Sequence, residues 1–129
     1  MKIVRRDSIH WKQKKGYSKK IFLDENDLGR KGALVQEVKI KAGETAKEHY
    51  HKKQIEIFYF LNTNGYWIVN GKRLTFNIGD VLVIEPFDKH IVVNNTKEDY
   101  LYVAFKYDYD PKDFYWIREK AKSDSPKIK

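Results

Sequence analysis

Short apolar stretches alternate with turn-forming residues over most of the chain. Several stretches are rich in β-branched and aromatic residues, and others alternate apolar and polar positions with the period of a half-buried strand. Asn70-Gly71 separates two of them and is the strongest type of short hairpin signal. Short strands punctuated by turns predict an all-β sandwich or barrel. The expected strands cover 20–23, 34–41, 49–51, 55–61, 66–69, 72–76, 81–85, 90–94 and 100–106.

The two ends of the chain depart from this pattern. Residues 1–32 are polar and weakly patterned, and we expect this N-terminal arm to pair on a sheet edge or on another subunit. Asp110 is a good N-cap residue, Pro111 suits a first helical position, and Phe114 and Ile117 follow at helical spacing. The sequence therefore predicts one C-terminal helix over 111–122, packed on the outside of the barrel, and a disordered tail over 123–129.

Length and composition indicate a single domain over residues 1–129. The absence of cysteine excludes disulfides, thiolate metal sites and cysteine nucleophiles. No long apolar run is present, and no apolar signal core follows the charged N-terminus. We therefore expect a cytoplasmic protein without a membrane partner.

The chain is basic, with 26 Lys and Arg residues against 18 Asp and Glu residues and a formal net charge of +8. A solvated lysine-rich surface is the first interpretation of this charge, and an anionic small-molecule partner is the second. No helix-turn-helix, zinc-finger or RNA-binding signature accompanies the basic residues, so we expect no nucleic-acid partner.

Three histidines and a glutamate are the candidate chemistry. His49 and His51 are two positions apart, so on a strand their side chains project to the same face. Glu56 begins the next apolar strand, and His90 begins a later one. Imidazole and carboxylate groups are ligands that first-row divalent metals prefer. His10, which lies in the N-terminal arm, is interpreted as a surface residue.

These residues lie in two stretches that resemble the two motifs of the cupin superfamily. The second stretch has Glu85 and Phe87 where the superfamily usually has proline and glycine. In the first stretch the closing glycine comes two residues later than the superfamily pattern places it. The matching residues are Gly43, His49, His51, Glu56 and Gly65 in the first stretch, and Gly79, His90 and Asn94 in the second.

The resemblance implies a small double-stranded β-helix barrel of jelly-roll type with its core over 33–106. It also implies one divalent metal ion per chain, which would be iron, manganese, nickel or zinc. Neutral imidazoles and a single carboxylate would leave such an ion Lewis acidic. The implied ligands are His49, His51, Glu56 and His90.

The cavity walls are a separate prediction. Phe58 and Phe60 share a strand face with Glu56, so we expect them to line the pocket and keep it apolar. No catalytic residue is assigned beyond the metal ligands. Glu85 is a candidate proton donor at the mouth of the second motif, although a surface glutamate is the more common interpretation.

Three functions remain open. The first is a metal-dependent enzyme that catalyses a dioxygenase-type oxidation or an isomerisation of a small oxygenated substrate. The second follows from a looser resemblance of 49–53 and 107–115 to nucleotide-sugar ketoisomerases of the cupin fold, which implies metal-free catalysis with His49 and His51 as general acid and base. The third is a non-enzymatic sensor or small-molecule-binding barrel. Small cupins often form dimers, so a homodimer is expected.

Overall fold

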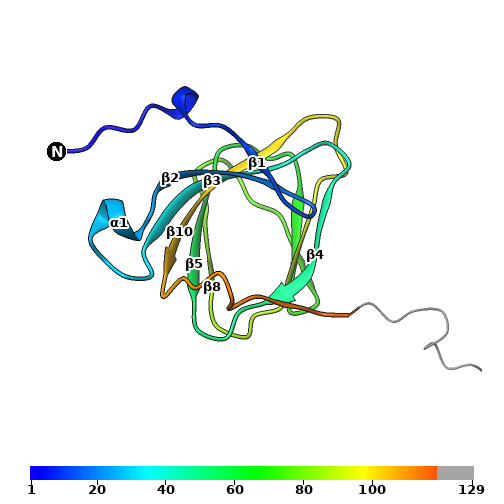
Figure 1. Cartoon of the computed structure of the whole chain (residues 1–129). Coiled ribbons are helices and arrows are strands. Elements are labelled where there is room, and N and C mark those ends of the chain that lie inside the picture. The colour runs from blue at the N-terminus through cyan, green and yellow to red at the C-terminus, as the bar shows by residue number, and fades with distance from the viewer. Residues whose placement is uncertain (119–129) are drawn as a thin grey trace, which may run out of the picture.

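The computed structural model describes residues 1–118, which form two facing antiparallel β-sheets, so the predicted all-β class is confirmed (Figure 1). The strand order is β1-β2-β3-β10-β5-β8 in the six-stranded sheet and β11-β4-β9-β6-β7 in the five-stranded sheet. Residues 1–118 contain no helix long and apolar enough to cross a membrane. The elements are η1 (Arg6–Ser8), β1 (Lys12–Gln13), β2 (Ser18–Leu23), α1 (Glu25–Leu28), β3 (Leu34–Ile40), β4 (Thr45–Tyr50), β5 (Ile55–Phe60), β6 (Tyr66–Val69), β7 (Lys72–Leu74), β8 (Val81–Ile84), β9 (His90–Val93), β10 (Tyr100–Tyr107) and β11 (Tyr115–Trp116).

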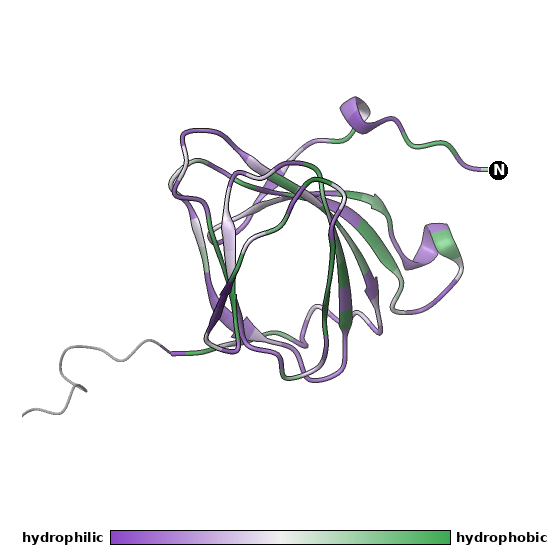
Figure 2. Ribbon diagram, turned by 180° about the vertical axis from the view of Figure 1, so that it is seen from behind, coloured by the Kyte–Doolittle hydropathy of each residue, from purple (hydrophilic) through white to green (hydrophobic). Residues whose placement is uncertain are grey.

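Alternate residues of the facing strands fill the space between the sheets. Gln36, Val38 and Ile40 share the predicted inner face of β3, and all three are buried. Phe58 on the six-stranded sheet packs against Trp67 on the five-stranded sheet, with 4.7 Å between the ring centroids. Hydrophobic and hydrophilic residues are interleaved along the strands (Figure 2). Burial of the hydrophobic side chains is the main force that holds the sheets together.

The hairpin predicted at Asn70-Gly71 joins β6 to β7. Both residues have positive φ, 50° at Asn70 and 81° at Gly71, as a tight type I′ turn requires. The register pairs Val69 with Lys72 directly across this turn. Local turn chemistry therefore sets this part of the topology.

The N-terminal arm extends the six-stranded sheet at one edge. β1 and β2 form a hairpin, and β2 pairs with β3. Arg6 adds a two-point ion pair to buried Glu37 on β3, with Nε–Oε1 at 2.6 Å and Nη2–Oε2 at 2.9 Å. Gly16 in the hairpin turn has a φ of +82°, and a Cβ there would overlap the carbonyl oxygen of Thr45. The arm thus pairs with the six-stranded sheet through β2 and contacts the five-stranded sheet at Thr45.

The predicted helix over 111–122 is wrong for its described part. Residues 111–118 form a turn followed by β11, which pairs with β4 in the five-stranded sheet. The local helix signal is overridden because Asp113 is recruited to cap the backbone of residues 52–54 and Phe114 packs against His49. The rest of that predicted helix, 119–122, and the predicted disordered tail, 123–129, lie outside the described residues.

Candidate metal centre

The four predicted ligands come from both sheets. His49 and His90 are directly paired across β4 and β9, after a register shift in β4 between Ala46 and His49. His51 follows the end of β4, and Glu56 belongs to β5 in the opposite sheet. All four are buried, with exposed fractions of 2–8%. The sandwich therefore brings together residues that are 41 positions apart along the chain, from His49 to His90.

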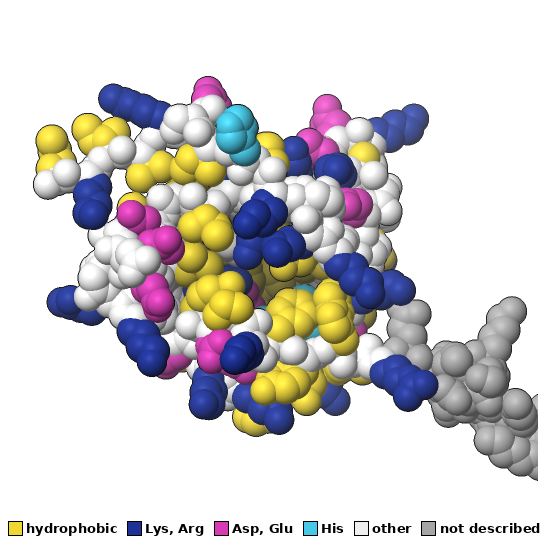
Figure 3. Space-filling view, viewed as in Figure 1, with side chains coloured by type: hydrophobic (Ala, Val, Ile, Leu, Met, Phe, Trp, Pro, Cys, Tyr) yellow, Lys and Arg dark blue, Asp and Glu magenta, His cyan; other side chains and the backbone are white. Residues whose placement is uncertain are grey.

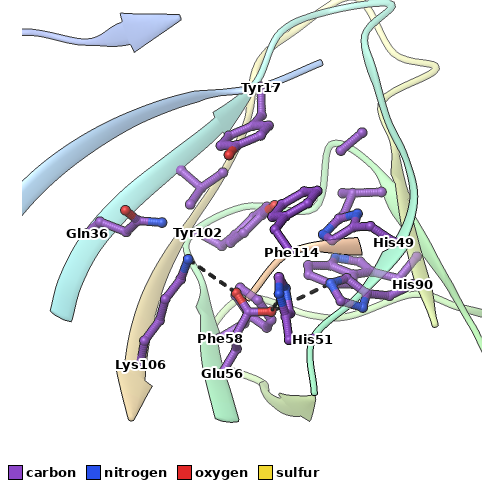
Figure 4. Close-up of a pocket in the computed structure, with 14 residues that line it drawn as sticks. Tyr17, Gln36, His49, His51, Glu56, Phe58, His90, Tyr102, Lys106 and Phe114 are labelled. Carbon is purple, nitrogen blue, oxygen red and sulfur yellow. Dashed lines mark ion pairs between the residues drawn. The ribbon is translucent and has the colours of Figure 1, made fainter. Parts of the chain in front are cut away.

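The three imidazoles form one cluster, and the Glu56 carboxylate lies beside two of them, His51 and His90. One nitrogen from each of His49, His51 and His90 lies within 4.8 Å of the other two. Oε1 of Glu56 is 3.1 Å from Nε2 of His51 and 3.6 Å from Nε2 of His90. Figure 4 shows the Glu56 carboxylate beside the histidine rings.

Backbone carbonyls fix the orientation of each ring. Nδ1 of His49 is 2.7 Å from the carbonyl oxygen of Lys47, and Nδ1 of His90 is 2.9 Å from that of Asp88. Nδ1 of His51 is 2.6 Å from the carbonyl oxygen of Asp113. A carbonyl only accepts hydrogen bonds, so each Nδ1 carries a proton, and in a neutral ring Nε2 then keeps a free lone pair directed away from that carbonyl. Histidine ligands of protein metal sites are held in this way.

With a neutral His51 ring, a lone pair of His51 Nε2 and a lone pair of Glu56 Oε1 face each other. Both atoms are buried, and among the described residues neither has a well-directed hydrogen-bond partner, even though they are 3.1 Å apart. Two buried acceptors without a donor are costly. A cation between them would remove that cost.

The electrostatics favour neutral rings at His49 and His90 and an ionised carboxylate at Glu56. Burial lowers the pKa of His49 to about 3, and burial also lowers the pKa of His90. Burial alone would raise the pKa of Glu56, but the Lys106 ammonium and a contact with His51 lower it. The set thus presents one negative charge and three unprotonated nitrogens, which suits a divalent ion.

Lys106 occupies the far side of the carboxylate. It is the direct cross-strand partner of Glu56, and its Nζ lies 3.5 Å from Oε2 (Figure 4). The other oxygen, Oε1, is left to face the histidines. Lys106 is only 12% exposed, so it places a positive charge inside the cavity wall.

The chamber in front of these groups is small and mostly apolar, with a volume of about 50 Å³. Phe58 is in its wall, as expected. Phe60 is not among the lining residues; it stacks on Phe76 in the core, with 4.4 Å between ring centroids. Glu85 is exposed in the loop after β8 and does not line the chamber. The remaining lining residues are Tyr17, Gln36, Val38, Ala46, Trp67, Val92, Tyr102 and Phe114.

The C-terminal segment closes the site and was missed by the sequence reasoning. Phe114 stacks on His49 with 4.5 Å between ring centroids and 8° between planes. The carboxylate of Asp113 accepts hydrogen bonds from the backbone N–H groups of Lys52, Lys53 and Gln54, at 2.7–3.0 Å. These bonds lower the pKa of Asp113, although burial alone would raise it. Asp113 thus holds both the loop after His51 and, through its carbonyl, the His51 ring.

Lys106 was also missed, although the sequence contained a signal for it. Tyr102 and Ala104 are buried on the inner face of β10, and Lys106 continues their two-residue alternation. A lysine in phase with core residues is unusual enough to mark a functional position.

Comparisons with known proteins give a family and one curated relative. The model of the cupin domain family matches residues 36–105. The oxalate-binding protein of Thermotoga maritima is 27% identical over 83 residues, which cover 64% of this chain and 69% of that protein.

Solved structures share the fold. The polyketide cyclase RemF from Streptomyces resistomycificus superposes with a TM-score of 0.80 and 14% identity, covering 98% of this chain and 91% of that one. A double-stranded β-helix protein from Klebsiella pneumoniae superposes with a TM-score of 0.72 and 15% identity, covering 92% and 99%. These likenesses confirm the predicted double-stranded β-helix class.

Proposed function

This chain belongs to the cupin domain family, and we propose that it binds one divalent metal ion, iron, manganese, nickel or zinc. The proposed ligands are Nε2 of each of the three histidines and Oε1 of Glu56. The observation that carries the proposal is the buried cluster of three histidine nitrogens within 4.8 Å of one another, beside which His51 Nε2 and Glu56 Oε1 lie 3.1 Å apart without a well-directed hydrogen bond among the described residues. The carbonyl bonds that direct each Nε2 inward support the same conclusion.

We further propose that the metal centre acts on a small, oxygenated, anionic substrate. A bound divalent ion supplies Lewis acidity that polarises a substrate oxygen. The chain supplies an apolar enclosure through Phe58 and Phe114, which excludes water from the chamber. Lys106 adds a positive charge beside the carboxylate. Dioxygenase-type oxidation or isomerisation is the proposed chemistry.

A binding protein without catalysis is the second candidate. The curated relative is named for binding oxalate, a small dicarboxylate, and not for a reaction. Glu85, the proton donor considered from the sequence, does not line the chamber. A barrel that retains a metal-bound anion would need no such donor.

Metal content tests the centre directly. Purified protein is stripped with a chelator, reloaded with each candidate metal, dialysed and measured by elemental analysis. We expect about one ion per chain in the wild type and a severe loss in His51→Ala and Glu56→Gln. His10→Ala is the matched control, because His10 is exposed in the N-terminal arm. Equal metal content in His51→Ala and His10→Ala would refute the proposed centre.

Substrate assays then separate the three functions. The loaded and the stripped proteins are each mixed with oxalate and other small oxyanions, and binding, oxygen uptake and product formation are recorded. Turnover that needs metal supports the enzyme, and saturable binding without turnover supports the binding protein. Turnover of a nucleotide-sugar by the stripped protein, lost in His49→Ala, would instead establish the metal-free isomerase.

We also propose that the protein is a homodimer. On the outer face of β10, β5 and β8, the sheet register aligns Phe105 with Ile57 and Val83. Tyr59 and Val81 pair in the neighbouring row. Phe105, Tyr59, Val81 and Val83 are 42–55% exposed, which is an apolar surface at a free sheet edge. Sedimentation should give a dimer for the wild type and a monomer for Val83→Lys; a monomeric wild type would refute the proposal.

A further inference from the structure

A second cavity adjoins the metal chamber. Its volume is about 270 Å³, close to the lower end of the roughly 300–1,000 Å³ range of small-molecule sites. It shares four wall residues with the chamber, so the two spaces are neighbours. The shared residues are Tyr17, His51, Lys106 and Phe114. Figure 3 shows Lys and Arg side chains gathered beside a hollow in this face of the molecule, with hydrophobic side chains around it.

Both ends of the chain build this second cavity, which we call the vestibule. The β1–β2 hairpin supplies Lys14, Lys15 and Lys19, and the C-terminal segment supplies Tyr109 and Trp116. Neither end belongs to residues 36–105, which match the cupin domain family. The vestibule is therefore built largely by segments outside the part of the chain that matches the family model.

Cations in the vestibule outnumber the anions that could neutralise them. Lys14, Lys15, Lys19 and Lys106 line it, and Lys106 forms an ion pair with Glu56. Among residues 1–118, no carboxylate lies within ion-pair distance of the other three lysines.

Two acids, Asp110 and Asp113, also lie in the wall; they are fewer than the four lysines, and each accepts backbone hydrogen bonds. The Asp113 carboxylate accepts three backbone N–H groups, and Oδ1 of Asp110 accepts the N–H of Lys112 at 2.9 Å. The fold therefore holds several ammonium groups together around an open space.

The environment of Lys19 reflects this crowding. Lys19 is half-buried, and its pKa is lowered to about 8 by burial first and then by repulsion from Lys106, Lys14 and Lys12. A bound anion would relieve this repulsion. Gln54 gives an independent indication: its side chain is 1% exposed in the vestibule wall, and among the described residues its amide Nε2 has no acceptor. An anion with several oxygens would suit both the ammonium groups and the amide donor.

We propose that the vestibule binds the phosphate-type oxyanion of a substrate whose other end reaches the metal centre. The substrate class is an organic molecule that carries a multiply charged anionic group at one end and metal-binding oxygens at the other. Only the placement of the other end of the substrate at the metal centre rests on the proposed function. The vestibule binds the anionic group through its own lysines. The ring of Phe114 lines both spaces and contacts the ring of Trp116 in the vestibule wall, so the two rings suit an apolar or planar linking portion.

Calorimetric titration of inorganic pyrophosphate into chelator-treated protein tests the vestibule without the metal. We expect saturable binding that weakens about tenfold or more in Lys19→Ala and in Lys14→Ala. Lys72→Ala removes the same charge from the exposed β6–β7 hairpin and should bind within about twofold of the wild type. Malonate in place of pyrophosphate, in a parallel titration, separates a phosphate preference from a carboxylate preference.

The outcomes are distinct from those of the metal experiment. Lys19→Ala should keep the full metal content of the wild type, because Lys19 lies outside the metal centre. Pyrophosphate binding by a protein that takes up no metal when it is reloaded would sustain the vestibule and reject the centre. The vestibule is overturned if pyrophosphate does not bind saturably, if Lys19→Ala binds it as well as the wild type does, or if Lys72→Ala weakens it equally. Stronger binding of malonate than of pyrophosphate would overturn the phosphate-type assignment.

Discussion

The metal-free protein should lose stability when the pH falls from neutral to about 5. An unfolded histidine has a pKa near 6.5, whereas burial lowers the pKa of His49 in the folded protein to about 3. Between these two values the unfolded chain binds a proton at His49 that the folded chain does not. The free energy of unfolding must therefore decrease as the pH decreases through this window.

The size of the effect follows from the same two pKa values. Each pH unit below the unfolded pKa costs about 1.4 kcal/mol, so at pH 5 His49 alone destabilises the fold by about 2 kcal/mol. His90 acts in the same direction, because its pKa is also lowered by burial. Glu56 contributes little in this window, since its lowered pKa means that its stabilising charge is lost only in stronger acid.

Urea unfolding in the presence of a chelator, at a series of pH values, measures this dependence. We compare the wild type with His49→Gln, which keeps a polar side chain but cannot titrate. The slope of unfolding free energy against pH should be shallower in His49→Gln by about one proton. The reasoning is refuted if the wild type is equally stable across this range, or if His49→Gln keeps the full slope.

Further outcomes follow from the same structure. Divalent metal at about a hundred times its dissociation constant should raise the unfolding free energy by about 2.7 kcal/mol, seen as a higher melting temperature that a chelator reverses. Asp113→Ala should destabilise by about 1–3 kcal/mol and weaken metal retention, because three backbone N–H groups lose their acceptor; unchanged urea midpoint and metal content would contradict this. Gly16→Ala should lower the free energy of unfolding in urea more than Gly71→Ala does. Both glycines have positive φ, but of the two only Gly16 has a backbone atom where the new Cβ would lie. Phe60→Ala should cost about 3–5 kcal/mol while metal content stays at wild-type level, and a loss of metal would place Phe60 in the site after all.

The core of the fold was predictable because its signals are local. The two-residue alternation of β3 placed Gln36, Val38 and Ile40 on one buried face, as the structure has them. Asn70-Gly71 specified its own turn through backbone geometry. Such positions can be read from a single sequence because their physical cause lies within a few residues.

The C-terminal segment was not predictable because its conformation depends on distant partners. Asp110 and Pro111 are good helix-initiating residues, yet Asp113 caps a loop about sixty positions earlier in the chain. The prediction that Phe60 lines the chamber is wrong for a related reason. Strand alternation gives the inner face, but it does not tell which inner residues meet the chamber and which meet Phe76 in the core.

Asp113 holds the loop after His51 through three backbone hydrogen bonds, and this has a consequence for biosynthesis. A nascent chain that has emerged from the ribosome only as far as β10 already contains every proposed ligand, but it lacks the carbonyl that orients the His51 ring and the ring that covers His49. We therefore expect such a chain to hold its histidines loosely and open to any ion nearby. Selective uptake then begins only after translation has delivered residues 113–116, so metal loading waits for a segment that follows every proposed ligand in the sequence.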